Sequence, residues 1–232
     1  MKIVIVSAME KELEKLLGLV KKYEEKVVCD YKFYEAKYLG NDLIMTIGGI
    51  GKVQTGLILG VILSTYKSID YLINLGVSGG VKGKVNPGDV VVGNRYSFAD
   101  VDATFGGKFA FGEVPYLPRV YNANLDLIKD LNMHDFVLGD VLSGDTFFTS
   151  KEETDLIVNK YFSDLNVCAF DMESTAFAEG CYIHHISFFA IRAISDIIGG
   201  SGQVTEYHDY VHEASMKSAK LLLSILDTLK SD

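Results

Sequence analysis

Short apolar runs of strand length alternate along the chain with stretches whose apolar residues recur at helical spacing. Four strand-like runs are each followed by a helix-like stretch: residues 3–7 and 10–20, 43–47 and 52–66, 167–170 and 173–182, and 188–195 with a stretch to about 229. This alternation predicts one layered α/β domain over residues 1–232 with a largely parallel central sheet. Residues 31–38 and 90–92 predict further strands, and the Gly- and Asp-rich residues 100–119 predict a long excursion.

Composition and charge narrow the classes of function. The formal net charge is -9 and no Lys/Arg cluster is present, so nucleic acid is not an expected partner. The longest uncharged run, residues 53–66, is shorter than the roughly 20 residues that cross a bilayer, and no membrane partner is expected. The cysteines Cys29, Cys168 and Cys181 form no CxxC pair, which predicts buried free thiols in a reducing cytoplasm.

Neither a metal nor another cofactor is expected. His208 and His212 lie four residues apart, but the stretch HDYVH lacks the glutamate of a zinc-protease motif. The turn GGIGKV lacks the third glycine of a dinucleotide-binding fingerprint, and Val53 replaces the Ser or Thr of a Walker A loop. Its glycines, Gly48, Gly49 and Gly51, instead predict a strand-to-helix turn where the backbone approaches a ligand closely.

A carboxylate lies on the apolar side of the first predicted helix. At about 100° per residue, Glu12 falls between Leu16 and Leu19, whereas Glu10 and Glu14 take the opposite side. Ligands of parallel sheets bind beyond the carboxyl ends of the strands. The position of Glu12 therefore predicts either a carboxylate aimed into a cavity or an edge residue that reaches solvent.

A second carboxylate follows the predicted strand 167–170. If the next helix begins at Met172, Glu173 shares its face with Ala176 and Gly180, whose small side chains leave room beside it. We expect Glu173 to face a ligand. Asp171, by contrast, is expected to complement the dipole of the helix.

Two charged residues interrupt the apolar run SFFAIRAISDII. Arg192 and Asp196 are four apart, which predicts that both lie on one side of an extended strand. Since an unpaired buried charge is costly, they either pair with each other or face a ligand and further charges. Three carboxylates after three separate strands, Glu12, Glu173 and Asp196, favour acid–base chemistry over simple binding.

Two adjacent aromatic residues, Phe147 and Phe148, follow another predicted strand. One of them can stack on a planar ring, and packing in the core is an equal alternative.

Eight motifs follow one another from one end of the chain to the other: MKIVIVSAMEKELEKL, GGIGKVQTG, INLGVSGG, PGDVVV, DVDAT, LSGDTFF, FDMESTA and IRAISD. In these motifs the chain resembles the 5′-methylthioadenosine/S-adenosylhomocysteine nucleosidases of the nucleoside phosphorylase and hydrolase superfamily. The resemblance implies a three-layer α/β/α sandwich with a mixed, largely parallel central sheet, active as a homodimer. It also implies hydrolysis of the N-glycosidic bond of both nucleosides to adenine and the thioribose, in methionine and S-adenosylmethionine salvage.

The resemblance further implies roles for individual residues. Asp196 would carry or share a proton at adenine N7, Glu12 would activate the attacking water, and Glu173 would hold the ribose hydroxyls and stabilise positive charge on the sugar. Arg192 and Ser195 would support them. The substrate would be bound by Phe147, the backbone of Phe148, Met172, Met9, Ile50, Val77, Ser78, Gly79 and Tyr207, and in the neighbouring subunit by Ala103, Phe105 and Pro115.

Three alternative functions remain open from the sequence. A purine nucleoside phosphorylase of the same superfamily would use phosphate, for which the GGIGK turn offers no arginine fork but does offer backbone amides. An aminodeoxyfutalosine nucleosidase would use the same chemistry on a larger 5′ group. A non-catalytic nucleoside-binding module is the third, although it has little need for Glu12.

Overall fold

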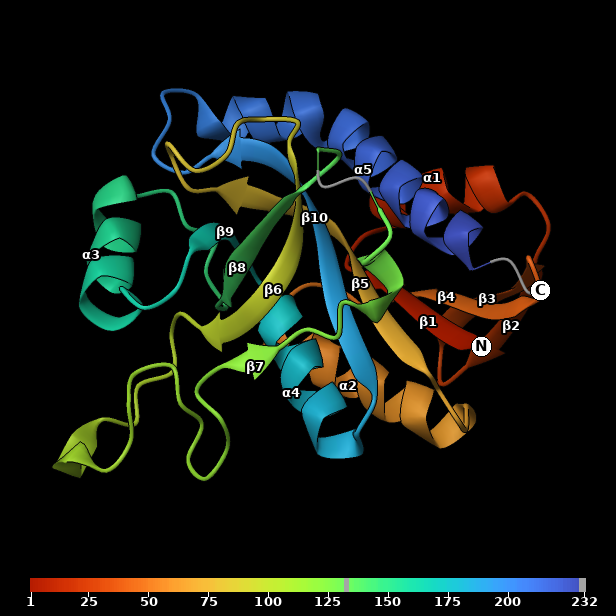
Figure 1. The fold of residues 1–232 in the computed structure, drawn as a ribbon, viewed down its shortest axis with the longest axis horizontal. Coiled ribbons are helices and arrows are strands. Elements are labelled where there is room, and N and C mark those ends of the chain that lie inside the picture. The colour runs from red at the N-terminus through yellow and green to blue at the C-terminus, as the bar shows by residue number, and fades with distance from the viewer. Residues whose placement is uncertain (132–133, 230–232) are drawn as a thin grey trace.

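The centre of the fold is a mixed sheet, part of which closes on itself (Figure 1). We describe residues 1–131 and 134–229 in a computed structural model of the chain. The strands are β1 (Lys2–Ser7), β2 (Glu24–Val28), β3 (Tyr31–Tyr38), β4 (Asn41–Ile47), β5 (Tyr71–Gly80), β6 (Val90–Phe98), β7 (Tyr121–Asn122), β8 (Val137–Ser143), β9 (Val167–Asp171) and β10 (Ser187–Ile197). Every strand predicted from the apolar pattern is confirmed, and β6 and β10 extend beyond their predicted ends.

Parallel pairing dominates the middle of the sheet. β1 lies between β4 and β5 and is parallel to both, and β5 is also parallel to β10. From β10 the pairing continues through β6, β8 and β9 and returns to β5, so these five strands form a closed ring. The edge formed by β2, β3 and β4 is antiparallel. The predicted mixed sheet is therefore confirmed.

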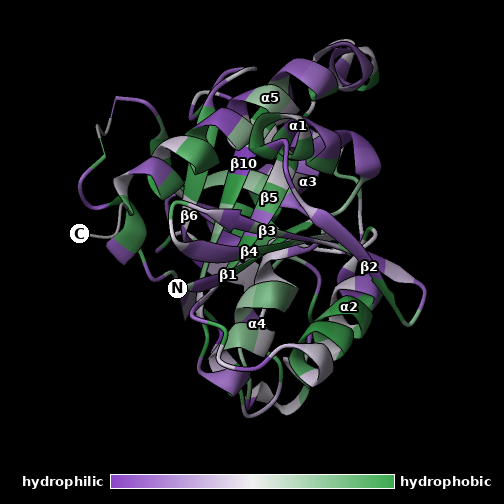
Figure 2. Cartoon of the chain, turned by 90° about the vertical axis from the view of Figure 1, so that its right-hand side faces the viewer, coloured by the Kyte–Doolittle hydropathy of each residue, from purple (hydrophilic) through white to green (hydrophobic). Residues whose placement is uncertain are grey.

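Helices cover both faces of the sheet (Figures 1 and 2). α1 (Glu10–Val20) and α5 (Gln203–Thr228) lie on one side, and α2 (Lys52–Thr65) and α4 (Ser174–His184) on the other. α3 (Lys151–Tyr161) and the 3-10 turns η1 (Phe105–Gly107) and η2 (Asp126–Ile128) complete the elements.

The layers follow from the period of two along each strand. In β1, Ile3 and Ile5 pack in the core under α1 and α5, whereas Val4 and Val6 pack in the core over α2 and α4. Both sets are fully buried. One strand thus supplies two hydrophobic cores, which is why it reads as a continuous apolar run, and the expected α/β/α sandwich is confirmed.

Strand β10 carries an irregularity that changes where its charges point. Arg192 is opposite Gly76 of β5, but Asp196 is opposite Gly79, so β10 contains one residue more than β5 between the two pairs. An extra residue of this kind is a bulge, and it breaks the regular alternation of sides. The prediction that Arg192 and Asp196 share one side of the strand is therefore wrong.

Two further features concern the periphery. Residues 100–119 form the predicted excursion, which extends away from the sheet (Figure 1). All three cysteines are free, and Cys168 and Cys181 are buried as predicted. The predicted burial of Cys29 is wrong, because this residue lies in the exposed turn between β2 and β3. Within residues 1–131 and 134–229, no helix is both long and apolar enough to cross a membrane.

Candidate active site

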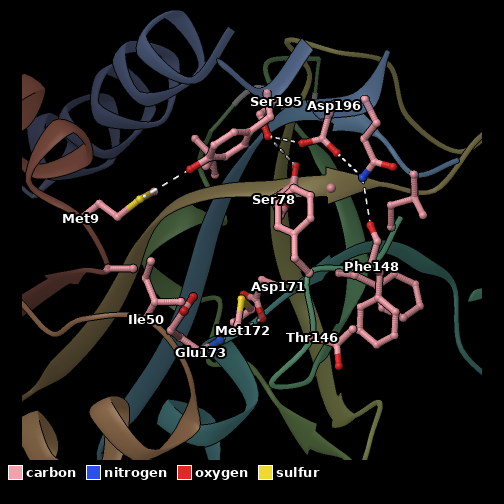
Figure 3. A pocket seen from close by; sticks show the side chains of 18 of the residues that line it. Met9, Ile50, Ser78, Thr146, Phe148, Asp171, Met172, Glu173, Ser195 and Asp196 are labelled. Carbon is pink, nitrogen blue, oxygen red and sulfur yellow. Dashed lines mark hydrogen bonds between the residues drawn. The ribbon is translucent and has the colours of Figure 1, made fainter. Parts of the chain in front are cut away.

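A pocket of about 630 Å³, its open mouth included, lies at the carboxyl ends of β1, β5 and β10 (Figure 3). Most of the residues predicted for the site line it: Met9, Glu12, Ile50, Val77, Ser78, Gly79, Phe147, Phe148, Met172, Glu173, Ser195, Asp196 and Tyr207.

Four predicted residues do not line the pocket. Arg192 lies behind the carboxylates and is only 1% exposed. Ala103, Phe105 and Pro115 belong to the excursion of residues 100–119, where the Phe105 side chain is fully exposed.

Glu12 is held in the pocket by two backbone amides. One carboxylate oxygen accepts a hydrogen bond from the N–H of Met9 (2.9 Å), the residue that precedes α1, and the other accepts from the N–H of Val77 in β5 (3.0 Å). The side chain is buried, so the structure follows the cavity alternative and not the solvent one. Burial raises the pKa of Glu12, and the charge of Arg192 and these hydrogen bonds oppose that rise.

Glu173 precedes its helix and does not lie on a face of it. α4 begins at Ser174, and Glu173 has the non-helical angles φ -133° and ψ -37°. The expected start of the helix at Met172 is wrong because the Asp171 carboxylate accepts hydrogen bonds from the N–H groups of Glu173 and Ser174 (3.2–3.3 Å), which holds the chain in a turn there.

The glycine turn before α2 binds Glu173 in this position. The N–H of Gly51 donates to the Glu173 carboxylate (2.9 Å), and Gly51 has a φ of 91° that favours glycine. Burial and the neighbouring charge of Asp171 raise the pKa of Glu173 to about 7, although the charge of Arg192 lowers it. Glu173 is thus poised between its two protonation states near neutral pH.

A single buried arginine connects these carboxylates. The Nε of Arg192 donates to Asp171 (2.7 Å). Its Nη2 donates to the amide oxygen of Asn74 and lies 3.7 Å from the Glu173 carboxylate. Arg192 therefore pairs with Asp171, not with Asp196 as the alternative from the sequence had it. Asp171 has a larger role than the expected dipole partner, because it caps α4 and also neutralises Arg192.

Close packing leaves no room for a side chain between Arg192 and Glu12. A Cβ atom on Gly76 would lie 2.6 Å from a nitrogen of Arg192 and 2.8 Å from an oxygen of Glu12. Glycine at this position of β5 is what lets the cation and the carboxylate approach the strand.

Asp196 has different partners from the other two carboxylates. One oxygen accepts from the hydroxyl of Ser195 (2.6 Å) and the other from the side-chain amide of Gln203 (2.8 Å), as Figure 3 shows. Burial raises the pKa of Asp196, whereas these two hydrogen bonds lower it and the charge of Glu206 raises it.

Of the two adjacent phenylalanines, Phe148 packs in the core and Phe147 lies at the pocket. Phe148 is buried, and its ring packs edge-on against Phe170 (5.0 Å). Phe147 is half-exposed and makes an edge-on contact with Tyr207 (5.7 Å), whose hydroxyl reaches the sulfur of Met9 (3.5 Å). Phe147, Tyr207 and Met9 thus form an apolar wall at the mouth of the pocket.

Sequence reasoning missed two polar residues of the site and gave a third too small a role. Gln203 lies after the glycine-rich stretch GGSG, where no periodic pattern marks it. Asn74, which is fully buried, had a usable signal, since it is the one polar residue within the apolar run YLINLGV. Asp171 was noticed but judged from helix position alone. In the described part of the chain, no group of three His, Cys, Asp or Glu residues is arranged to hold a metal ion.

Comparison with known proteins decides the family. The model of the Phosphorylase superfamily matches residues 2–228. The chain belongs to the phosphorylase superfamily. A 5′-methylthioadenosine/S-adenosylhomocysteine nucleosidase of Geobacillus sp. is 33% identical over 99% of this chain and 100% of the relative, which assigns the chain to that nucleosidase family.

Solved structures of the same superfamily have the same fold. The S-adenosylhomocysteine nucleosidase of Streptococcus pyogenes, in complex with 5-methylthiotubericidin, has a TM-score of 0.90 and 30% identity over 99% of this chain and 97% of that one. The 5′-methylthioadenosine/S-adenosylhomocysteine nucleosidase of Colwellia psychrerythraea, in complex with adenine, has a TM-score of 0.89 and 29% identity over 99% of this chain and 96% of that one.

Removing the buried cation should destabilise the fold in a pH-dependent way. Arg192→Met leaves buried carboxylates without a counter-charge, a change that typically costs about 3–5 kcal/mol. Without Arg192 the pKa values of Glu12 and Glu173 rise further above those of the unfolded chain, so the folded state binds more protons and loses stability as pH rises. Urea unfolding should therefore show that Arg192→Met lowers the free energy of unfolding, relative to the wild type, by more at pH 8 than at pH 5.

The matched control is Arg119→Met, because Arg119 pairs with the exposed Asp164. Arg119→Met should lower the free energy of unfolding by at most about 1 kcal/mol, and by the same amount at pH 5 and pH 8. An equal loss at pH 5 and pH 8 for Arg192→Met would contradict the role given to this cation.

Proposed function

We propose that the protein hydrolyses the N-glycosidic bond of 5′-methylthioadenosine and S-adenosylhomocysteine, giving adenine and the thioribose, as a step in methionine and S-adenosylmethionine salvage. The observation that carries this proposal is the placement of three buried carboxylates with raised pKa values around one pocket, Glu12, Glu173 and Asp196. The nucleosidase relatives and the bound adenine and nucleoside analogue of the two structural neighbours support the choice of substrate.

Asp196 is the general acid in this scheme. Adenine is a poor leaving group until a ring nitrogen takes up a proton, and a positioned acid typically contributes roughly 100- to 10,000-fold. Burial raises the pKa of Asp196, which favours the protonated form that can donate to N7. The Ser195 hydroxyl supports the carboxylate that remains after transfer.

Glu12 and Glu173 act at the sugar. Glu12, fixed by two backbone amides, accepts a proton from the attacking water, and the charge of Arg192 favours the ionised form that a base requires. Glu173 binds the ribose hydroxyls and stabilises the positive charge that develops on the sugar as the bond to adenine breaks. The electron pair of that bond leaves with the protonated adenine.

The other pocket residues bind substrate without reacting. Phe147 stacks on adenine from the mouth and the backbone of Phe148 meets its edge. The sugar and the 5′-alkylthio group lie against Met172, Met9, Ile50, Val77, Ser78, Gly79 and Tyr207.

The first turn of α2 argues for water as the nucleophile and against phosphate. A helix N-terminus of this kind binds anions well. Here, however, the N–H of Gly51 donates to Glu173 and the N–H of Lys52 donates to Asp145 (2.8 Å), so carboxylates of the chain occupy these amides. Arg192 is likewise engaged with Asp171 and Glu173.

The purified protein should therefore release adenine from 5′-methylthioadenosine at a rate that does not depend on phosphate. Adenine can be followed by absorbance or chromatography, and the sugar identified by mass. Free methylthioribose in both buffers is the expected product. A sugar 1-phosphate would assign the chain to the phosphorylases, and no adenine in either buffer would leave a binding module.

Substitution of either proton-transfer group should lower turnover without unfolding the protein. Asp196→Asn and Glu12→Gln should each reduce kcat at least about 100-fold, because each removes one proton transfer while keeping the shape of the side chain. Glu14→Gln, an exposed change on the same helix as Glu12, is the control and should retain the wild-type rate. A near-normal kcat for Asp196→Asn or Glu12→Gln would remove that residue from the mechanism.

We also propose that the protein acts as a homodimer in the cytoplasm. Helix α2, green over much of its length in Figure 2, exposes Val53 and Leu57 one turn apart, and Ile50 beside them reaches the pocket. Lys52 binds Asp100 at the start of the excursion (2.7 Å), so the exposed Phe105 belongs to a segment that begins beside this apolar face. Ala103, Phe105 and Pro115 then meet the thioalkyl group bound by the partner.

The proposed location in the cytoplasm rests on the cysteines. The free thiols Cys168 and Cys181 suit a reducing compartment.

Light scattering should give twice the mass of one chain. Val53→Glu together with Leu57→Glu should yield a folded monomer with a raised KM for 5′-methylthioadenosine, because the proposed dimer would have to bury these charges. The exposed change Leu156→Glu on α3 should leave both mass and KM unchanged. A monomeric wild-type protein would refute the dimer without affecting the assignment of the reaction.

A further inference from the structure

We propose that Gln203 is a positioning residue for the reaction: its side-chain amide holds the Asp196 carboxylate and the Phe148 carbonyl in one fixed arrangement. This inference rests on the proposed function, in which Asp196 is the general acid and the backbone of Phe148 meets the edge of adenine. Gln203 is the first residue of α5.

Three separate segments meet at the Gln203 side chain. Its Nε2 donates to Asp196 Oδ2 at the end of β10 (2.8 Å) and to the carbonyl oxygen of Phe148 (2.9 Å), both drawn in Figure 3. Its Oε1 accepts from the N–H of Gly199 in the connection to α5 (3.0 Å). The side chain is 5% exposed, so these bonds are sheltered from water.

The chemistry of two backbone partners fixes the orientation of the amide. A backbone N–H only donates, so the atom beside Gly199 is the oxygen; a carbonyl only accepts, so the atom beside Phe148 is the nitrogen. Both requirements give the same orientation. Asp196 Oδ2 therefore faces an obligatory donor, and the carboxylate cannot rotate without losing that bond.

This arrangement distinguishes the two oxygens of Asp196. Because Oδ2 accepts from Gln203, Oδ1 is the oxygen that holds the proton when Asp196 is neutral. The Ser195 hydroxyl lies 2.6 Å from Oδ1 and 3.3 Å from the carbonyl of Ser78, and it can donate to either. When the proton passes from Oδ1 to the purine nitrogen, its bonding pair stays on the carboxylate, and Gln203 stabilises the charge that results.

The charged groups around Asp196 allow this effect to be measured. Glu206, also on α5, opposes ionisation of Asp196, while Glu12, Glu173 and the Arg192 behind them belong to the other end of the pocket. Gln203 and Ser195 lower the pKa of Asp196. Activity that needs protonated Asp196 falls as pH rises through this pKa, so loss of the Gln203 donor should move that fall to higher pH.

The test is Gln203→Met, which keeps the length of the side chain and removes the donor. The alkaline limb of the kcat/KM profile for 5′-methylthioadenosine should move up by about one pH unit, the effect of losing one hydrogen bond to a charged group. In the substrate-free protein, ¹³C NMR of the Asp196 carboxyl carbon, assigned with Asp196→Asn, should show the same upward shift. Val204→Met, at the exposed neighbouring position, is the control and should move neither.

A uniform loss of rate at every pH with an unmoved Asp196 titration would overturn the proposal and leave Gln203 a merely structural residue. Should Gln203→Met fail to fold, Gln203→Asn, which keeps the amide but draws it back by one methylene, replaces it in both measurements with the same expected shift. If the wild-type protein releases no adenine, the proposed function fails, while the NMR titration still decides whether Gln203 acts on Asp196.

Discussion

The buried guanidinium of Arg192 is the interaction on which the site depends. It is almost completely enclosed, so its charge must be met by groups of the protein, and Asp171 and Glu173 meet it. Asp171 in turn accepts from the first N–H of α4, and Glu173 accepts from the turn that starts α2. Two helices on one face of the sheet are thereby placed by the same ion cluster that lies under the pocket. Replacing such a cluster by apolar groups is often neutral for stability, so its presence fits a role in placing charges.

Local pattern explains how far the sequence alone could predict this fold. The sequences of β1 and β10 are apolar runs because both faces of each strand pack in a hydrophobic core. Such a run can be recognised as a strand without knowing which strands it pairs with. β2 was missed for the opposite reason: it is short, charged and mostly exposed, so no apolar period marks it. The closed ring of β5, β10, β6, β8 and β9 depends on contacts distant in sequence, and period alone carries no information about them.

The same distinction holds for the site. Glu12 could be found because a regular helix converts sequence spacing directly into direction. Arg192 and Asp196 were found as residues but misplaced in orientation, since a bulge leaves no trace in the apolar pattern. Glu173 was found for a partly wrong reason: its direction comes from a non-helical turn that the Asp171 carboxylate stabilises. Gln203 carries no periodic signal because its partners come from two other segments.

The bulge in β10 also keeps the charge of Arg192 apart from Asp196. The charge of Arg192 lowers the pKa values of Glu12 and Glu173, whereas the groups that shift the pKa of Asp196 are Ser195, Gln203 and Glu206. One extra residue in a strand thus places the three carboxylates in two different electrostatic environments. Glu12 and Glu173 lie near the cation of Arg192, whereas Asp196 accepts hydrogen bonds from Ser195 and Gln203. A substitution beside Asp196 can therefore change its pKa while leaving the pKa values of Glu12 and Glu173 as they are.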